Sequence, residues 1–225
     1  MAGLTLSAFD VIGPVMVGPS SSHTAGAARI GLIARRLLGE PPHRARLGLH
    51  GSFAATGKGH ATDRALVAGL LGETPESESL PTALERAPTA GLAVEFCAID
   101  LGETAHPNSV QLHLEGPQHE LNLTAASLGG GVIAINSVDG HAVQITGSRP
   151  TLVSWHTDRP GYLAALTAAL AYATVNITTI STTRKNRGGA ALTVVEADEA
   201  FAPAIATIVG AMAGVSRIVL LPAQP

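Results

Sequence analysis

Hydrophobic residues in the last third of the sequence change their spacing in an order that few folds can satisfy. Residues 151–157 alternate as a strand does, residues 162–174 form an apolar run of helical length, and residues 176–184 alternate again. The same strand-helix-strand order is repeated within residues 190–221. A chain with the order β-α-β-β-α-β can bury its apolar faces in a four-stranded sheet with both helices on one face. The pattern therefore predicts a small separate domain at this end of the chain.

The preceding residues follow a different plan, with helices first and strands later. Helical spacing marks residues 24–38 and 60–72, and residues 80–87 are predicted to form a short helix. Between the first two helices, residues 44–51 alternate as a strand does. After the helices the spacing changes to two, which predicts short strands at residues 92–99, 109–116, 119–127, 131–138 and 141–147. The predicted fold class is α+β, with a mostly antiparallel sheet in a first domain at residues 1–148 and a ferredoxin-like βαββαβ domain at residues 150–225.

Composition limits the classes of function that the chain can have. Only 3% of its residues are aromatic while 46% are hydrophobic, so its cores must be built from Ala, Val, Leu and Ile. The formal net charge is −3 and no region is strongly basic, which argues against nucleic-acid binding. The single cysteine, Cys97, excludes an intrachain disulfide and an all-cysteine metal site within this chain. A reducing cytoplasm fits this composition best.

The apolar segment at residues 1–18 is predicted to be neither a signal peptide nor a membrane span. It has no basic residue, it contains Asp10, and it is interrupted at Gly13 and Pro14. The protein is therefore predicted to be soluble and cytoplasmic.

Five polar residues in a row stand at the start of the first predicted helix. Ser20, Ser21, Ser22 and Thr24 are all suited to cap a helix, and His23 adds a group that titrates near neutral pH. The helix N-terminus after them has unpaired N–H groups and the positive end of the helix dipole, so it favours a carboxylate or a phosphate. The alternative is an ordinary serine-rich start of a helix.

A second candidate site lies in the Gly-rich stretch 51–63, whose glycines let the backbone approach a ligand. Lys58 and His60 lie at its tip, before the second predicted helix. The chain contains twelve Arg and two Lys residues, so a Lys at this place indicates a need for a compact ammonium group rather than a planar guanidinium. The stretch is not a Walker P-loop, whose lysine is followed by Ser or Thr. The alternative is a mobile Gly-rich turn.

The HPNS turn at residues 106–109 is a third candidate. Its proline holds the side chains of His106 and Asn108 at a set angle, which is useful for gripping a carboxylate or a hydroxyl group. Asn and Pro are also common in turns that bind nothing, so an ordinary turn is the alternative. The three glycines at 129–131 are predicted to form a bulge or tight turn, because a strand follows them.

The DRPG turn at residues 158–161 places Pro160 at the first turn of a predicted helix, behind Asp158 as its cap. The basic RKNRGG turn at residues 184–189 is predicted to be a solvated hairpin turn. The remaining histidines have no partner pattern and are predicted to be surface or structural residues: His43, His50, His113, His119, His141 and His156.

Three of these motifs, taken together, resemble a known family. They are VIGPVMVGPSSSHTAGAARIG (residues 11–31), GSFAATGKGHATDRALVAGLLG (residues 51–72) and HPN (residues 106–108). They are similar to the beta subunit of the bacterial iron-sulfur-dependent L-serine dehydratase, also called L-serine ammonia-lyase. Residues 151–222 resemble an ACT domain. The resemblance covers nearly the whole chain, and the motifs are specific in this order and spacing.

The resemblance implies a lyase that converts L-serine to pyruvate and ammonia, using a 4Fe-4S cluster held by three cysteines of a partner alpha subunit. This chain has a single cysteine, which agrees with a cluster held by the alpha subunit. The residues implied to bind and order the L-serine carboxylate are Ser20, Ser21, Ser22, Thr24, His106 and Asn108, together with His23. For catalysis the candidates are His23, Lys58 and His60, and the general base is one of these or a residue of the alpha subunit.

The ACT resemblance implies a regulatory role for the second domain. It implies that an effector contacts Asp158 and Gly161. Sheet edges such as residues 151–157 or 176–181 are predicted to pair with a second copy of the chain. The rival interpretation is a non-enzymatic regulatory module, because the first domain also resembles the allosteric substrate-binding domain of some phosphoglycerate dehydrogenases, which takes an anion. The combination of SSSHT with HPN favours the dehydratase.

Overall fold

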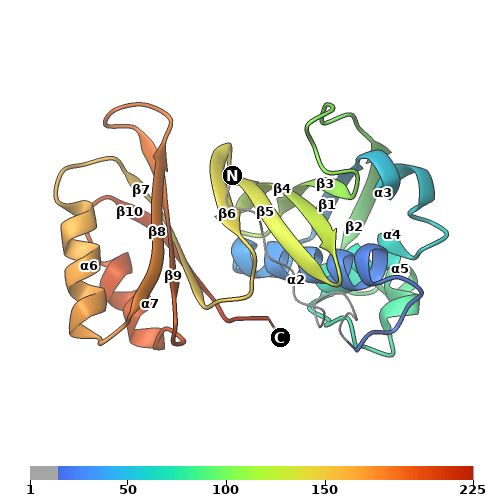
Figure 1. The fold of residues 1–225 in the computed structure, drawn as a ribbon, viewed down its shortest axis with the longest axis horizontal. Coiled ribbons are helices and arrows are strands. Elements are labelled where there is room, and N and C mark those ends of the chain that lie inside the picture. The colour runs from blue at the N-terminus through green and yellow to red at the C-terminus, as the bar shows by residue number, and fades with distance from the viewer. Residues whose placement is uncertain (1–14, 225) are drawn as a thin grey trace. The chain divides into compact units, whose positions relative to one another are not determined.

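The structure is a computed structural model that describes residues 15–224 (Figure 1). The chain forms two compact units, Met1–Asp139 and Gly140–Pro225. The first unit ends nine residues before the predicted end of the first domain at residue 148, because the short strand β6 (His141–Ile145) is grouped with the second unit. The segment at residues 1–18 was predicted to be neither a signal peptide nor a membrane span. Most of that segment, residues 1–14, lies outside the described range. Within residues 15–224, every helix is too short or too polar to span a lipid bilayer.

The first unit contains helices early and strands late, as the change of spacing predicts. Its helical segments are η1 (Ser21–Ala25, a π-helical turn), α2 (Gly26–Leu38), α3 (Gly51–Thr56), α4 (Thr62–Leu71), η2 (Leu80–Thr82, a 3-10 turn) and α5 (Ala83–Arg86). Its strands are β1 (Arg44–Leu49), β2 (Ala93–Ala98), β3 (Ser109–Glu115), β4 (Glu120–Gly129) and β5 (Val132–Val138). The predicted α+β class is confirmed.

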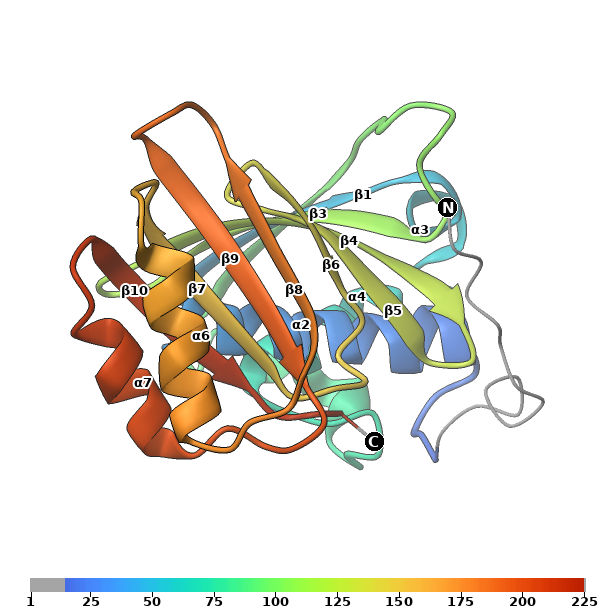
Figure 2. The same ribbon diagram turned by 60° about the vertical axis from the view of Figure 1, so that its left-hand side comes forward.

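The sheet of the first unit has the strand order β2-β1-β3-β4-β5. Strands β1 and β2 are parallel, and the other neighbouring pairs are antiparallel. Helix α2 lies along one face of β4 and β5 (Figures 1 and 2). Side chains on this face, such as Leu112 of β3 and its cross-strand neighbour Leu123 of β4, are buried. The core of the first unit therefore lies between this face of the sheet and the helices.

Helices α2 and α4 touch through their backbones at two glycines. A Cβ atom at Gly31 would lie 2.2 Å from the carbonyl oxygen of Leu66. A Cβ atom at Gly69 would lie 2.2 Å from the carbonyl oxygen of Ala28. Real Cβ atoms cannot approach an oxygen this closely, so any side chain at either position would force the two helices apart.

The two helices run in the same direction from the same end of the unit. Near their starts, Thr24 Oγ1 donates a hydrogen bond to the carbonyl oxygen of His60 at 3.0 Å. Near their ends, Arg35 Nη1 donates to the carbonyl oxygen of Leu70 at 2.8 Å. The serine-rich turn before α2 and the Lys58–His60 turn before α4 are therefore neighbours.

Helix α3 was not predicted from the sequence, since residues 51–63 were expected to form a Gly-rich loop. Of the six residues of α3 only Phe53 is buried, so the sequence shows no helical spacing of apolar side chains there. The expected loop is confined to the turn 57–61 between α3 and α4, which carries Lys58 and His60.

The second unit has the predicted β-α-β-β-α-β order after β6. Its elements are β7 (Thr151–Thr157), α6 (Tyr162–Tyr172), β8 (Ile177–Arg184), β9 (Ala190–Ala197), α7 (Pro203–Gly210) and β10 (Val215–Leu221). The sheet order is β10-β7-β9-β8, with every neighbouring pair antiparallel, and both helices lie on one face (Figure 1). The core between the helices and the sheet includes Leu152, Leu166, Leu170, Val195 and Ile205.

Two details of the second unit correct the expectations. Strand β7 is an interior strand, because β9 and β10 pair with its two sides, so the sheet edges are β8 and β10. Helix α6 begins after Gly161, so Pro160 lies outside it and Asp158 does not cap it. The Asp158 carboxylate instead accepts hydrogen bonds from the Gly188 amide at 3.0 Å and from Arg184 Nη1 at 2.7 Å. These two bonds lower the pKa of Asp158 below its ordinary value, and the bond from Gly188 has the larger effect.

Candidate functional site

The serine-rich turn meets helix α3 around the ring of His23. The Nε2 atom of His23 lies 3.1 Å from Ser52 Oγ and 3.1 Å from Thr56 Oγ1, two hydroxyl groups one turn apart on α3. The ring of Phe53 packs edge-on against His23, with 5.3 Å between the ring centroids. Two of the sequence motifs are thus joined by side chains as well as by neighbouring helices.

The HPN turn is attached to the start of α3 by its backbone. The carbonyl oxygen of Pro107 accepts hydrogen bonds from the amides of Ser52 at 2.8 Å and Phe53 at 3.4 Å. Gly51 permits this approach, since its φ is +54° and a Cβ atom there would lie 2.7 Å from the Pro107 oxygen. Within the turn, His106 Nδ1 accepts a hydrogen bond from the Asn108 amide at 3.1 Å. All three motifs therefore converge on α3.

Ser127 of strand β4 also holds the site together, and sequence reasoning did not find it. Its hydroxyl donates to the carbonyl oxygen of Ser22 at 2.8 Å, and its amide donates to the carbonyl oxygen of Asn108 at 2.9 Å. The side chain is fully buried against α2, where a Cβ atom at Gly26 would lie 2.0 Å from Ser127 Oγ. The only signals in the sequence are a serine in an otherwise apolar stretch of strand and a glycine at the helix start.

The hydroxyl groups of the serine-rich turn fall into two sets. Ser20 is the N-cap, and its Oγ accepts a hydrogen bond from the His23 amide at 3.2 Å. Thr24 is fully buried and uses its hydroxyl in the bond to the turn before α4. Ser21 and Ser22 are half-buried, and their hydroxyl groups bond to none of residues 15–224. These two hydroxyl groups are the ones that the turn leaves free for a ligand.

His23 is held in its neutral form. Burial lowers its pKa below the ordinary value of 6.5, and repulsion from His60, whose ring centroid is 4.9 Å away, lowers it further. A hydrogen bond to the backbone of Ser52 opposes part of this shift. At pH 7 the His23 ring is therefore an uncharged hydrogen-bonding group.

His60 presents a free ring nitrogen. Its Nδ1 atom lies 3.1 Å from the carbonyl oxygen of Thr56. Because a carbonyl oxygen only accepts hydrogen bonds, Nδ1 carries the proton of the neutral ring and Nε2 carries the lone pair. No residue in the described part of the chain bonds to Nε2, and the side chain is exposed. His60 can therefore accept a proton or a hydrogen bond from a ligand.

A pocket of about 560 Å³ lies between α3, the turn after it and strand β2. It is lined by residues 49, 53–60, 63 and 96–98, so it includes both Lys58 and His60. Lys58 forms no ion pair or hydrogen bond with any residue from 15 to 224. An unpaired ammonium group at the wall of a pocket is suited to an anionic ligand, and the carboxylate of Asp63 lines the same pocket.

His106 does not line this pocket. It lines a second cavity of about 460 Å³, together with Ser109 of β3 and Asn136 of β5. Burial lowers the pKa of His106. The structure thus brings His23 and His60 together, whereas His106 is joined to them through the backbone of its turn.

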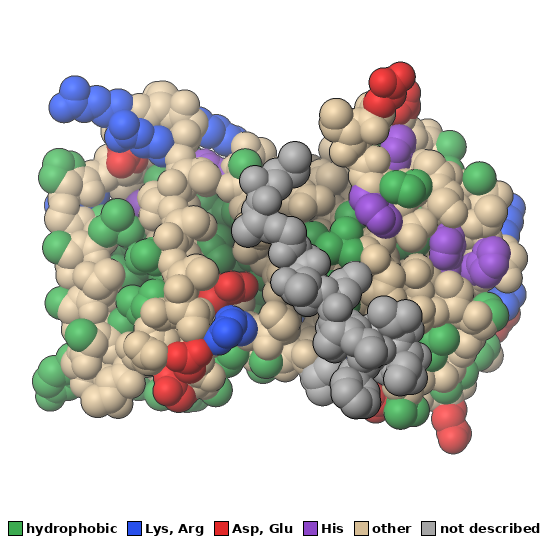
Figure 3. Space-filling view, viewed as in Figure 1, with side chains coloured by type: hydrophobic (Ala, Val, Ile, Leu, Met, Phe, Trp, Pro, Cys, Tyr) green, Lys and Arg blue, Asp and Glu red, His purple; other side chains and the backbone are tan. Residues whose placement is uncertain are grey.

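No metal centre is evident in residues 15–224, where no group of three His, Cys, Asp or Glu side chains lies close enough together to hold an ion. Cys97 is an exposed free cysteine at the wall of the larger pocket. Histidine side chains are exposed on the face of the first unit shown in Figure 3.

Comparison with known proteins supplies a family for this site. The model of the serine dehydratase beta chain family matches residues 7–92. The probable L-serine dehydratase beta chain of Bacillus subtilis (strain 168) is 42% identical over 193 residues, which are 86% of this chain and 87% of that protein. The L-serine dehydratase beta chain of Peptoniphilus asaccharolyticus is 37% identical over 94% of each chain.

A third relative is a longer protein. L-serine dehydratase 2 of Escherichia coli (strain K12) is 35% identical over 153 residues, which are 57% of this chain and 33% of that protein. The matched family model covers the serine-rich turn, α3 and the Lys58–His60 turn. Since two relatives are this similar over most of their own length, the chain belongs to the serine dehydratase beta chain family.

Proposed function

We propose that this chain is the beta subunit of an L-serine ammonia-lyase, which converts L-serine to pyruvate and ammonia together with an alpha subunit that carries a 4Fe-4S cluster. The observation that carries the proposal is the convergence of the serine-rich turn and the Lys58–His60 turn at one end of two helices in contact. The names of the two similar beta chains supply the substrate and the need for a second subunit. They also favour this function over a regulatory module like that of phosphoglycerate dehydrogenase.

In this proposal the serine-rich turn binds the carboxylate of L-serine. The free hydroxyl groups of Ser21 and Ser22 and the positive end of the following helix are suited to an anion. The neutral His23 supports the turn by its contacts with Ser52 and Thr56. A carboxylate bound there would leave the α-carbon of the substrate facing groups from the neighbouring turn.

Elimination of water from serine also needs removal of the α-proton and departure of the hydroxyl group. The ammonium group of Lys58 is proposed to stabilise the negative charge that develops as the proton leaves. The free Nε2 atom of His60 is the nitrogen that this chain offers to take the proton. Both groups lie in the turn between α3 and α4, so the site places them together.

The cluster is assigned to the alpha subunit because the residues of this chain do not fit it. Cys97 is the single cysteine, and the described residues hold no group of three ligands. When bound by its own subunit, such a cluster supplies a Lewis acid for the hydroxyl group of the substrate. The roles proposed for Ser21, Ser22, Lys58 and His60 require no bond to iron.

Replacement of Lys58 tests the proposal. In the assembled enzyme Lys58→Met should lower kcat/KM for L-serine by about 2 kcal/mol, or about 30-fold, the scale of losing one positioned charge. Arg64→Met is the matched control, because Arg64 is an exposed cation on α4 outside the pocket lining. Its kcat/KM should stay within about twofold. Equal losses in the two variants would show that Lys58 contributes only to the general charge of the surface.

We further propose that the second unit is an ACT-like regulatory domain through which two chains pair. Support comes from its β-α-β-β-α-β order and from the edge strand β8, whose residues 177–183 are uncharged and largely exposed. Gly161 has open space around it and remains the candidate effector contact. The Asp158 carboxylate, in contrast, is already bonded to Arg184 and Gly188.

Truncation after Arg149, which removes β7 to β10 with both helices of the second unit and keeps β6, separates regulation from turnover. The truncated beta chain, assembled with its partner, should keep measurable dehydratase activity but change its oligomeric state or its response to L-serine. Light scattering and a serine saturation curve measure these two properties. An unchanged assembly with an unchanged saturation curve would remove the regulatory assignment.

A further inference from the structure

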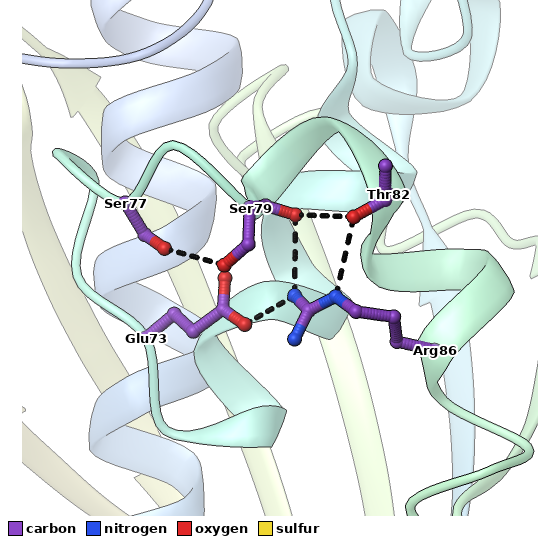
Figure 4. A network of polar contacts seen from close by, with 5 residues as sticks. All are labelled: Glu73, Ser77, Ser79, Thr82 and Arg86. Atoms are coloured by element: carbon purple, nitrogen blue, oxygen red, sulfur yellow. Dashed lines mark hydrogen bonds and ion pairs between the residues drawn. The ribbon is translucent and has the colours of Figure 1, made fainter.

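A polar network joins the end of helix α4 to helix α5, as Figure 4 shows. Arg86 of α5 forms an ion pair with Glu73, whose side chain is only 15% exposed. The same guanidinium group donates to the carbonyl oxygen of Ser79 at 3.1 Å and to Thr82 Oγ1 at 3.2 Å. Thr82 Oγ1 in turn donates to the Ser79 carbonyl at 2.9 Å. Arg86 is therefore bonded to both ends of the segment 73–79, so it closes this segment into a fixed loop.

The fixed loop is attached to the chain just before the serine-rich turn. The carbonyl oxygen of Pro75, a buried residue in the loop, accepts a hydrogen bond from the Val17 amide at 2.8 Å. Val17 precedes the N-cap Ser20 by three residues, with a glycine and a proline between them. A shift of Pro75 would therefore be passed on to the start of the turn.

A second link connects the loop with helix α2. The Glu76 carboxylate acts on Arg29 of α2, where its attraction opposes part of the lowering of the Arg29 pKa that burial causes. Arg29 Nη1 also donates to the carbonyl oxygen of Gly131 at 2.8 Å, in the glycine turn that follows strand β4. The loop 73–79 thus acts on both the residues before the serine-rich turn and the helix after it.

We propose that the Glu73–Arg86 ion pair is a positioning device for the serine-rich turn, and that it sets the affinity of that turn for the substrate carboxylate. The inference rests on the proposed function. Neither side chain bonds to a residue of the serine-rich turn, so both act on it through Pro75 and Val17. Removing the pair frees the loop, and the turn then samples positions in which Ser21 and Ser22 no longer meet the carboxylate together.

The test uses the assembled enzyme and compares Arg86→Met with Arg44→Met. Arg44 is the matched control, because it forms an exposed ion pair with Glu95 at 2.8 Å between β1 and β2 and bonds to none of residues 73–79. For Arg86→Met we expect KM for L-serine to rise about tenfold while kcat changes less than about twofold, since a loosened carboxylate site loses ground-state and transition-state binding alike. Arg44→Met should change neither quantity.

Two further variants keep the test independent of folding. Arg86→Lys retains a charge for Glu73 but loses the Nε group that donates to Thr82, so its KM should lie between those of wild type and Arg86→Met. Glu73→Gln keeps the shape of the acid and should raise KM in the same direction. A simple loss of folded protein would instead lower the apparent kcat at constant KM, and this result in all three variants would overturn the proposal.

Amide hydrogen exchange on the isolated chain tests the same link without turnover. In Arg86→Met the peptide spanning residues 15–24 should exchange faster than in wild type, and in Arg44→Met it should not. If wild-type complexes fail to deaminate L-serine while this exchange result holds, the proposed function fails and the positioning role stands. Unchanged exchange in residues 15–24 of a folded Arg86→Met chain would overturn the positioning role.

Discussion

Expressed and purified without a partner, this chain should bind no stoichiometric iron and should produce no pyruvate from L-serine. Its single cysteine cannot hold a 4Fe-4S cluster, and the described residues offer no group of three metal ligands. Coexpression under anaerobic conditions with a cysteine-bearing alpha subunit should give a brown, oxygen-sensitive complex that releases pyruvate. Iron analysis and a pyruvate assay on both preparations measure the difference, which we expect to be complete.

Cys97→Ala supplies the control within this chain. The thiol is exposed at the pocket wall, and the proposal gives it no bond to iron, so the variant complex should keep its full iron content. Loss of iron from that complex would assign a cluster ligand to the beta subunit. If the chain alone bound iron in stoichiometric amount and turned over L-serine, the assignment of the cluster to the alpha subunit would be wrong.

Gly69→Ala should lower the free energy of unfolding by about 3 kcal/mol or more, although one methyl group is added in a helix. Intrinsic propensity alone predicts the opposite, because Ala is favoured over Gly in a helix by about 1 kcal/mol. The added Cβ atom would lie 2.2 Å from the carbonyl oxygen of Ala28 and 2.5 Å from the amide nitrogen of Leu32. Both are backbone atoms of α2, so relief requires the whole helix to move. Urea unfolding followed by circular dichroism measures the change.

Gly210→Ala is the matched control for this substitution. Gly210 is also helical, in α7, but a Cβ atom there would meet only a methyl group of Ile218 at 3.7 Å, an ordinary contact distance. The variant should be unchanged or more stable by up to about 1 kcal/mol. If the two alanine variants had the same stability, the close approach of α2 and α4 would not be a determinant of the fold.

Most helices and strands were predictable because their apolar residues repeat with a period that burial enforces. All five strands of the first unit and the whole β-α-β-β-α-β order of the second unit were predicted from that spacing. Helix α3 was not predictable in this way, because it buries a single side chain, Phe53, and owes its position to bonds with Pro107. A helix held by its backbone leaves little trace in the hydrophobic pattern.

The site was predictable as a set of motifs but not as an arrangement. Repeated hydroxyl groups, glycines and an isolated Lys58 point to a ligand from composition alone. The link through Ser127 joins residues more than a hundred positions apart, and no local pattern encodes it. His106 and Lys58 line different cavities, and no local pattern of the sequence predicts that separation. Such relations arise only when the sheet and the helices are assembled.

The close contact between α2 and α4 also restricts which substitutions this chain can accept during evolution. Many packing contacts tolerate change, because a larger side chain on one helix can be offset by a smaller one on its neighbour. At Gly31 and Gly69 the nearest atoms belong to the backbone of the other helix, which no substitution can shorten. Neither glycine therefore has a compensating partner, and a lineage that lost one could recover only by reversion. This constraint also fixes the distance between the serine-rich turn before α2 and the Lys58–His60 turn before α4, whatever substitutions accumulate around them.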